Sequence, residues 1–242
     1  SVRSSLLTVL LVSLTLPASA VGQQVEVVDV DASRPSRIDR VDPRARDLRC
    51  ESVTVQVSLS SEALEHYRVV GELCARAGHV GQVVQVLVPG ATYDRAYWDF
   101  DYAWPHYSFA AAQANAGIAT LSLDRIGSGD SDRPAVAELS ADKSAYVVHQ
   151  VIAALRSGQL RAGRLGCIRP QKVVLVGHSF GSVVATIEAA TYRDVDGVIL
   201  SGILHSQGPQ TTALFGQVYP AALDPAFAVE GLPADGYLTT LP

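Results

Sequence analysis

The sequence predicts an α/β fold in which a mostly parallel sheet is covered by helices on both faces. Four short runs rich in β-branched residues lack polar alternation, as expected of strands buried on both faces: 82–88, 117–123, 172–177 and 197–202. Three stretches with helical character lie between these runs, at 108–116, 144–156 and 180–191. Strand–helix–strand alternation of this kind favours parallel strands joined by right-handed crossovers.

The composition is that of one globular domain. The chain has 242 residues, of which 48% are hydrophobic, which is enough for one sizeable core and too few for two ordinary domains. The formal net charge is −5 and the basic residues are not clustered. This charge distribution argues against nucleic acid as a partner.

The N-terminus has the three parts of a secretory signal peptide. Arg3 precedes an apolar run over residues 6–16, and residues 18–20 (Ala-Ser-Ala) form a small-residue cleavage site. We expect cleavage after Ala20, which would remove residues 1–20 and leave a secreted protein. No stable membrane anchor is expected, because the apolar run is too short to span a bilayer comfortably. The alternative of a buried N-terminal helix fits this pattern less well.

The rest of the chain is predicted to consist of a leader segment, a core and the start of a cap. Residues 21–51 are predicted to be an extended leader segment, because Asp, Arg and Pro are frequent there and apolar periodicity is absent. Residues 52–205 are predicted to form the core. It would begin with a strand at 52–59 and an antiparallel strand at 66–74. Residues 206–242, rich in Pro, Ala and Gly, are expected to be the start of a cap or lid.

Export makes the three cysteines candidates for a disulfide. Cys50 and Cys74 flank the two predicted N-terminal strands, whereas Cys167 precedes the strand that leads to Ser179. We therefore expect a Cys50–Cys74 disulfide, and a Cys74–Cys167 linkage would contradict this strand placement. The odd count leads us to expect that a partner for Cys167 is missing.

The segment Gly177-His178-Ser179-Phe180-Gly181 fits G-x-S-x-G between a buried strand and a helix. The motif alone is weak, but a sharp turn at this place would lift the serine hydroxyl above the sheet edge. Gly177 and Gly181 are required there, because a side chain at either would collide with the neighbouring strand and helix. Ser179 is therefore the candidate catalytic nucleophile. The alternative is an ordinary Gly-Ser linker.

Two backbone amides are candidates for an oxyanion hole, which stabilises the negative charge that acyl transfer places on a carbonyl oxygen. One is the amide of Phe180, at the N-terminus of the helix after the serine. The other is expected after the buried strand that ends in Pro89-Gly90, with Ala91 as first choice and Thr92 as the alternative.

The loop at 123–134 follows another buried strand. It lacks the third glycine of a G-x-G-x-x-G loop, and Asp130 and Asp132 would repel a pyrophosphate. Its acidic residues do not have the spacing of a calcium loop. A role in shaping the rim of the site is favoured, and no metal or cofactor is expected.

Together these segments resemble the α/β-hydrolase superfamily, and in particular secreted bacterial members of the esterase or lipase type. The matching residues, in family order, are Pro89-Gly90 with Trp98, the Asp-Arg-x-Gly-x-Gly-x-Ser run at 124–131, and the turn at 177–181. The resemblance implies Ser179 as nucleophile, the amides of Ala91 and Phe180 as oxyanion hole, and a small-molecule ester as substrate. Pro89 departs from the many relatives that have His before the glycine.

The resemblance also implies an acid and then a histidine after the nucleophile. The strand at 197–202 ends without a carboxylate, and the final strand of the family, with its histidine, is not recognisable. We therefore expect the triad acid and base beyond Pro242, with His205 as a remote alternative. Negligible ester hydrolysis is expected from residues 21–242 alone. Four histidines precede the turn at 177–181, on the wrong side for this order: His66, His79, His106 and His149.

The leading interpretation is a secreted serine hydrolase that cleaves an ester through an acyl-enzyme on Ser179. Lactonase, thioesterase, peptidase and carbon–carbon hydrolase chemistry stay open, whereas a nucleophilic serine argues against the epoxide-hydrolase and dehalogenase branches. A truncated or degenerate hydrolase without activity is the rival interpretation. An aromatic cluster at 93–109 either lines a substrate pocket or packs in the core or lid, and packing is favoured.

Overall fold

The computed structural model describes residues 48–76, 81–204, 206, 213, 216–230 and 236–240. The predicted signal peptide, residues 21–47 of the predicted leader, and His79 and His205 lie outside these residues. No helix in the described part of the chain is both long enough and apolar enough to cross a membrane.

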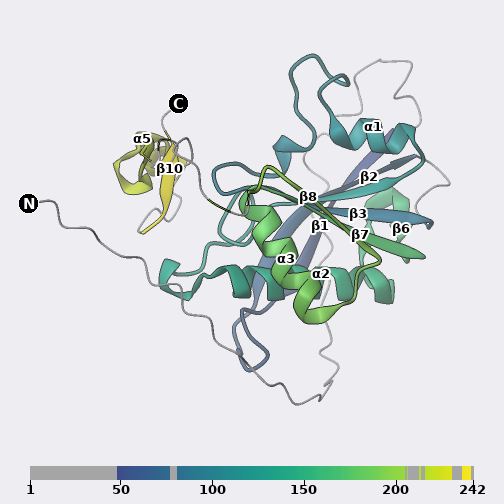
Figure 1. Cartoon of the computed structure of the whole chain (residues 1–242), viewed down its shortest axis with the longest axis horizontal. Coiled ribbons are helices and arrows are strands. Elements are labelled where there is room, and N and C mark those ends of the chain that lie inside the picture. The colour runs from purple at the N-terminus through teal and green to yellow at the C-terminus, as the bar shows by residue number, and fades with distance from the viewer. Residues whose placement is uncertain are drawn as a thin grey trace, which may run out of the picture.

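The central sheet has six strands in the order β1-β2-β4-β3-β7-β8 (Figure 1). Their bounds are β1 Leu48–Val57, β2 Tyr67–Arg76, β3 Val83–Val88, β4 Ala119–Leu123, β7 Lys172–His178 and β8 Gly197–Ser201. Strand β2 pairs antiparallel with both β1 and β4, and all other neighbours pair in parallel. The predicted α/β fold with a mostly parallel sheet is confirmed.

Three helices form the crossovers between the parallel strands. Their bounds are α1 Phe109–Asn115, α2 Ala141–Ser157 and α3 Phe180–Tyr192. Figure 1 shows α1 on one face of the sheet, and α2 and α3 together on the other. The hydroxyl of Ser108 caps α1 by accepting from the amide of Ala111, and that of Ser140 caps α2 by accepting from Lys143.

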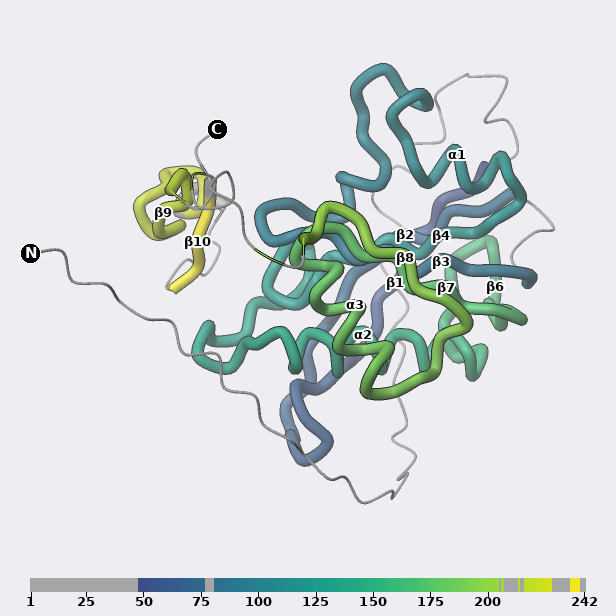
Figure 2. The backbone as a smooth tube through the Cα atoms, in the orientation of Figure 1, coloured from purple at the N-terminus to yellow at the C-terminus, as the bar shows by residue number. Residues whose placement is uncertain are grey.

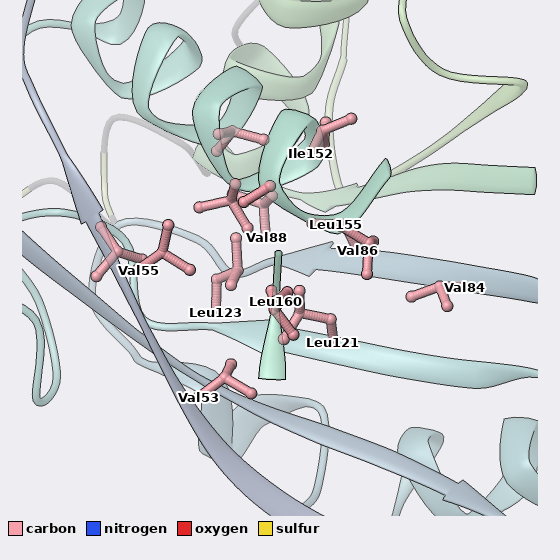
Figure 3. Packing of buried hydrophobic residues seen from close by; sticks show 14 of the residues in the cluster. Val53, Val55, Val84, Val86, Val88, Leu121, Leu123, Ile152, Leu155 and Leu160 are labelled. Carbon is pink, nitrogen blue, oxygen red and sulfur yellow. The ribbon is translucent and has the colours of Figure 1, made fainter. Parts of the chain in front are cut away.

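The main core lies between the sheet and the helices α2 and α3. Figure 3 shows alternate residues of β3 facing α2, among them Val84, Val86 and Val88. These valines, and Ile152 and Leu155 of α2, are completely buried. Each such side chain stabilises the fold by roughly 1.5–3 kcal/mol. The apolar residues that recur on one face of α2 and on one face of β3 therefore form one apolar layer between the two elements.

The shorter elements lie outside this core. A hairpin joins β5 Arg161–Ala162 to β6 Gly166–Cys167. A second antiparallel pair joins β9 Val218–Pro220 to β10 Leu238–Thr240, with α5 Pro225–Glu230 between them. Figure 2 shows β9 and β10 apart from the central sheet. The sequence shows neither pair, because strands this short have no measurable period.

Strand β1 differs from its predicted start, and its pairing with β2 confirms the predicted disulfide. Strand β1 begins at Leu48 rather than Ser52, so Cys50 lies within the sheet and not in the leader segment. Cys50 stands directly opposite Cys74 in the β1–β2 register, with their Cα atoms 4.1 Å apart, and the two form the expected disulfide. Cys167 is free and exposed.

Replacing Cys50 and Cys74 together with alanine is expected to lower the free energy of unfolding by about 3 kcal/mol. The disulfide joins residues 24 apart, and its loss gives the unfolded chain more conformational freedom. Urea denaturation of the oxidised proteins measures the difference. The matched control is Cys167→Ala, which should leave stability unchanged, and equal stability of all three proteins would contradict the prediction.

Candidate active site

Ser179 lies on the sharp turn between β7 and α3. Its backbone has φ 52° and ψ −121°, a conformation that a non-glycine residue adopts at a cost of roughly 1–3 kcal/mol. The Ser179 amide donates to the Ser201 carbonyl oxygen at 2.9 Å, and its own carbonyl accepts from the Ser182 amide at 2.9 Å. The residue is half-buried at the helix N-terminus. This is the geometry of a nucleophile elbow.

The two glycines of the motif are sites of close backbone approach. A Cβ atom at Gly177 would collide with the backbone of Gly181, and one at Gly181 would collide with the carbonyl oxygen of Val88. Strand β3 and the first turn of α3 therefore meet without intervening side chains. The steric reason for both glycines is the one expected from the sequence.

The elbow is also attached to the end of β8. The Ser182 hydroxyl lies 2.9 Å from the Ser201 carbonyl oxygen and accepts from the Ser201 amide at 3.2 Å. The Ser201 hydroxyl donates to the Gly177 carbonyl oxygen at 3.2 Å. Hydrogen bonds on both sides of Ser179 thus fix the height of the turn above the sheet.

Arg125 holds the loop that was predicted to supply the second oxyanion donor. Its guanidinium donates to the carbonyl oxygens of residues 89–91 at 2.8 to 3.2 Å. In a planar trans peptide the N–H points opposite to the C=O, so the amides of Ala91 and Thr92 face away from Arg125. The same guanidinium lies 5.2 Å from the ring centre of Phe180. One side chain therefore contacts both the loop with the Ala91 amide and the ring of Phe180, whose amide is the other candidate donor.

Arg125 remains a cation although it is largely shielded from solvent. Burial lowers the pKa of its guanidinium to about 10, which is still well above neutral pH. A charged planar donor with fixed geometry suits several carbonyl acceptors at once. Its hydrogen bonds to the loop are therefore present under physiological conditions.

Asp124 organises the rim around this loop. Its buried carboxylate accepts from the amides of Arg95 at 2.9 Å and Asp130 at 2.8 Å, and pairs with the Arg95 guanidinium. Burial raises the pKa of Asp124, and the charge of Arg95 opposes the rise. Gly129 has φ 56°, and a Cβ there would collide with the Asp124 carboxylate. The Asp-Arg-x-Gly-x-Gly-x-Ser run therefore joins two loops at the rim.

Tyr93 belongs to the aromatic cluster considered in the sequence analysis, but its contacts beside the nucleophile were not predicted. Its hydroxyl lies against Gly90 and forms a hydrogen bond with Nδ1 of His178. Burial and the neighbouring Tyr97 raise the pKa of Tyr93, and a hydrogen bond with the Ser179 side chain opposes this rise. The available signal was its position, two residues after Ala91 in the oxyanion loop.

His178 precedes the serine but is occupied elsewhere. Its ring stacks on Tyr97 with centroids 4.6 Å apart, and its other edge lies against Gly202. Burial lowers the pKa of His178, which favours the neutral ring. His178 therefore packs beside the nucleophile, and its Nδ1 is engaged by Tyr93.

The aromatic cluster divides into two groups. Trp98 is only 4% exposed and packs with Leu87 of β3. Three others are well exposed, with Phe100 at 53%, Tyr107 at 60% and Tyr102 at 70%. The favoured interpretation was packing in the core or in a lid; core packing fits Trp98 and does not fit these three residues.

Within the described residues, neither a histidine nor a carboxylate is hydrogen-bonded to the Ser179 hydroxyl. His149 is paired with Asp194 between α2 and the end of α3. The described residues thus bring together the predicted nucleophile, the oxyanion loop and Phe180, and they do not bring together a triad.

Comparison with known proteins identifies the family. The Alpha/beta hydrolase family matches residues 85–241, which is more than half of the chain. No curated protein matches the sequence significantly.

Several solved structures resemble the chain. Alpha/beta hydrolase GrgF from Penicillium sp. sh18 is 17% identical with a TM-score of 0.48, over 78% of this chain and 70% of that one. A mutant epoxide hydrolase from Vigna radiata is 14% identical with a TM-score of 0.45, over 65% of this chain and 41% of that one. Cfl2 from Burkholderia cenocepacia is 18% identical with a TM-score of 0.47, over 75% of this chain and 55% of that one. The chain therefore spans only part of each of these proteins, and by the family match it belongs to the alpha/beta hydrolase family.

Proposed function

We propose that this protein is a secreted serine hydrolase that cleaves a small-molecule ester through an acyl-enzyme on Ser179. The observation that carries the proposal is the strained turn at Ser179, held beside a loop whose carbonyl groups are turned toward Arg125. The proposal that the protein is secreted depends only on the signal-peptide pattern at the N-terminus. N-terminal sequencing of the secreted protein, with Val21 as the first residue, tests it.

In the proposed reaction, the Ser179 hydroxyl oxygen attacks the ester carbonyl carbon as its proton passes to a general base. The amides of Ala91 and Phe180 stabilise the resulting oxyanion, the alcohol leaves with a proton, and the acyl group stays on Ser179. Water then attacks the acyl-enzyme by the same route and releases the carboxylic acid.

We propose that the acid and base come from outside the described residues. Strand β8 supports this, because its apolar residues are exposed: Val198 at 39%, Ile199 at 46% and Leu200 at 46%. Parallel strands are normally covered on both faces, so further chain is expected to pack beside β8. That segment would bring the acid and the histidine next to Ser179. His205, which also lies outside the described residues, is the alternative to a histidine from that segment.

A fluorophosphonate probe tests the nucleophile directly, because it labels only an activated serine. We expect labelling at Ser179 in a chain that carries the triad acid and base, and negligible labelling of the 242-residue chain. The Ser179→Ala variant should lose the label, and the remote control Ser157→Ala should keep it. Absence of labelling in a chain that carries both groups would favour the noncatalytic alternative. Strong labelling of the 242-residue chain that His205→Ala abolishes would place the base within this chain.

A further inference from the structure

A second cluster of polar side chains lies between α2 and α3, apart from the loops around Ser179. His149 comes from α2, Glu188 from α3, and Asp194 from the segment that follows α3. Nδ1 of His149 lies 2.8 Å from Oδ2 of Asp194 and 4.0 Å from Oε1 of Glu188. One nitrogen or oxygen from each residue lies within 4.8 Å of those of the other two. Three segments of the chain therefore direct ligand atoms to one point.

Glu188 is the unusual member of this cluster. The residue is completely buried, and neither of its carboxylate oxygens has a hydrogen-bond partner. Oδ1 of Asp194 is buried without a hydrogen-bond partner as well. A buried polar atom without a partner costs roughly 1–3 kcal/mol, so three in one place call for a shared positive group.

We propose that His149, Glu188 and Asp194 form a binding site for a divalent transition-metal ion, with zinc as the best-suited ion. One imidazole nitrogen with carboxylate oxygens is a ligand set that suits zinc better than magnesium or calcium. The two carboxylates also balance the charge of a divalent ion. The proposal is independent of the chemistry proposed for Ser179.

The two ligand separations that involve His149 are compatible with such an ion. Zinc lies about 2.0–2.2 Å from nitrogen and oxygen ligands, so two ligand atoms on one ion are at most about 4 Å apart. The separation of 4.0 Å between His149 and Glu188 is at this limit, and a small rotation of either side chain closes it. Oδ1 of Asp194 can supply a fourth ligand atom.

The surroundings fix the ligands and leave a path for the ion. The ring of Tyr192 stacks on His149 with centroids 3.9 Å apart, and Nε of Arg156 donates to the Asp194 carbonyl oxygen at 2.6 Å. The stacking restricts rotation of the imidazole, and the hydrogen bond from Arg156 holds the backbone of Asp194. The side chains of His149 and Asp194 are 29% and 21% exposed, so an ion can enter from solvent.

A proton on Glu188 is the alternative to a metal ion at this site. Burial and the neighbouring Asp194 raise the pKa of Glu188 to about 9, so without a cation this carboxyl group holds a proton near neutral pH. The protonated group would donate to Asp194. A bound metal ion would replace this proton, and the experiment must separate the two states.

The test uses the purified protein in a Cys167→Ala background, because the exposed thiol could bind zinc on its own. After dialysis against EDTA, zinc sulfate is added in isothermal titration calorimetry and in thermal unfolding. We expect one zinc ion per chain and, at saturating zinc, a rise in Tm of roughly 5 °C. Glu188→Gln and the partly exposed His149→Gln should each abolish both effects.

The matched control is Glu138→Gln, which removes an exposed carboxylate elsewhere and should bind zinc like the parent. The absence of zinc, cobalt and manganese binding by the parent protein would overturn the proposal in favour of the shared proton. Equal zinc binding by Glu188→Gln and His149→Gln would overturn it as well, because the ion would then be bound at another place.

Discussion

Replacing Ser179 with alanine is expected to abolish ester hydrolysis by the active form of the protein, lowering kcat by at least about 10⁴-fold. Without the hydroxyl there is no atom to form the acyl-enzyme. The oxyanion donors can then stabilise only the direct attack of water on the ester. Initial rates with p-nitrophenyl butyrate measure the loss. The control Ser157→Ala removes a hydroxyl near the end of α2 and should keep full activity. An active Ser179→Ala variant would assign the nucleophile to another residue.

The same position should show a separate effect on stability. At φ 52° a side chain is strained and glycine is not, so Ser179→Gly should raise the free energy of unfolding by about 1 kcal/mol. Ser179→Ala keeps the Cβ atom and should leave stability unchanged. Urea denaturation of the three proteins compares them. A Ser179→Gly variant less stable than Ser179→Ala would show that the turn stores no strain.

Replacing Arg125 with lysine is expected to lower kcat by about 10²-fold while KM changes little. A lysine ammonium cannot hold the carbonyl groups of residues 89–91 together, so the Ala91 amide loses its fixed direction. The oxyanion forms only in the reaction, so the loss appears in kcat. The affinity for a boronic acid analogue of the transition state should fall by the same factor.

Arg133→Lys is the matched control for this experiment. Arg133 donates to the Gly129 carbonyl oxygen at 2.8 Å and makes no hydrogen bond to residues 89–91, so this substitution should leave kcat unchanged. An equal loss in both variants would mean that general disturbance of the rim is responsible. A rise in KM alone for Arg125→Lys would place the arginine in substrate binding.

The sheet was predictable from sequence because a buried parallel strand has a distinctive composition. Four strands of the central sheet, β3, β4, β7 and β8, follow the runs of apolar residues that the sequence displays. The ends of the helices were less predictable, because a helix-capping residue is polar and is not part of the apolar pattern. Helix α2 begins after Ser140, whereas its buried residues begin at Ser144, so the pattern predicted too late a start. Cys50 was left outside β1 because two consecutive polar residues, Glu51 and Ser52, interrupt the apolar alternation of this strand.

The candidate site was predictable only where a local motif defines it. Ser179 and its glycines follow from spacing within one turn, but the role of Arg125 depends on a loop far away in sequence. The contact of Tyr93 with His178 was not predicted, because the two residues are 85 apart in sequence. Glu188 was missed because a sequence pattern cannot distinguish a buried glutamate on an apolar helix from an exposed one.

The attachment of the elbow to β8 has a consequence for the order of assembly. The hydrogen bond between Ser182 and Ser201 joins residues only 19 apart, and strand β3, against which the elbow packs, precedes both. A chain that emerges N-terminus first from a ribosome or an export channel can therefore complete this turn as soon as Ser201 is released. Under the proposed assignment, the nascent nucleophile is shaped before its proton acceptor exists. Ser179 would then have no hydrolytic activity until the segments that carry the acid and the base have folded beside it.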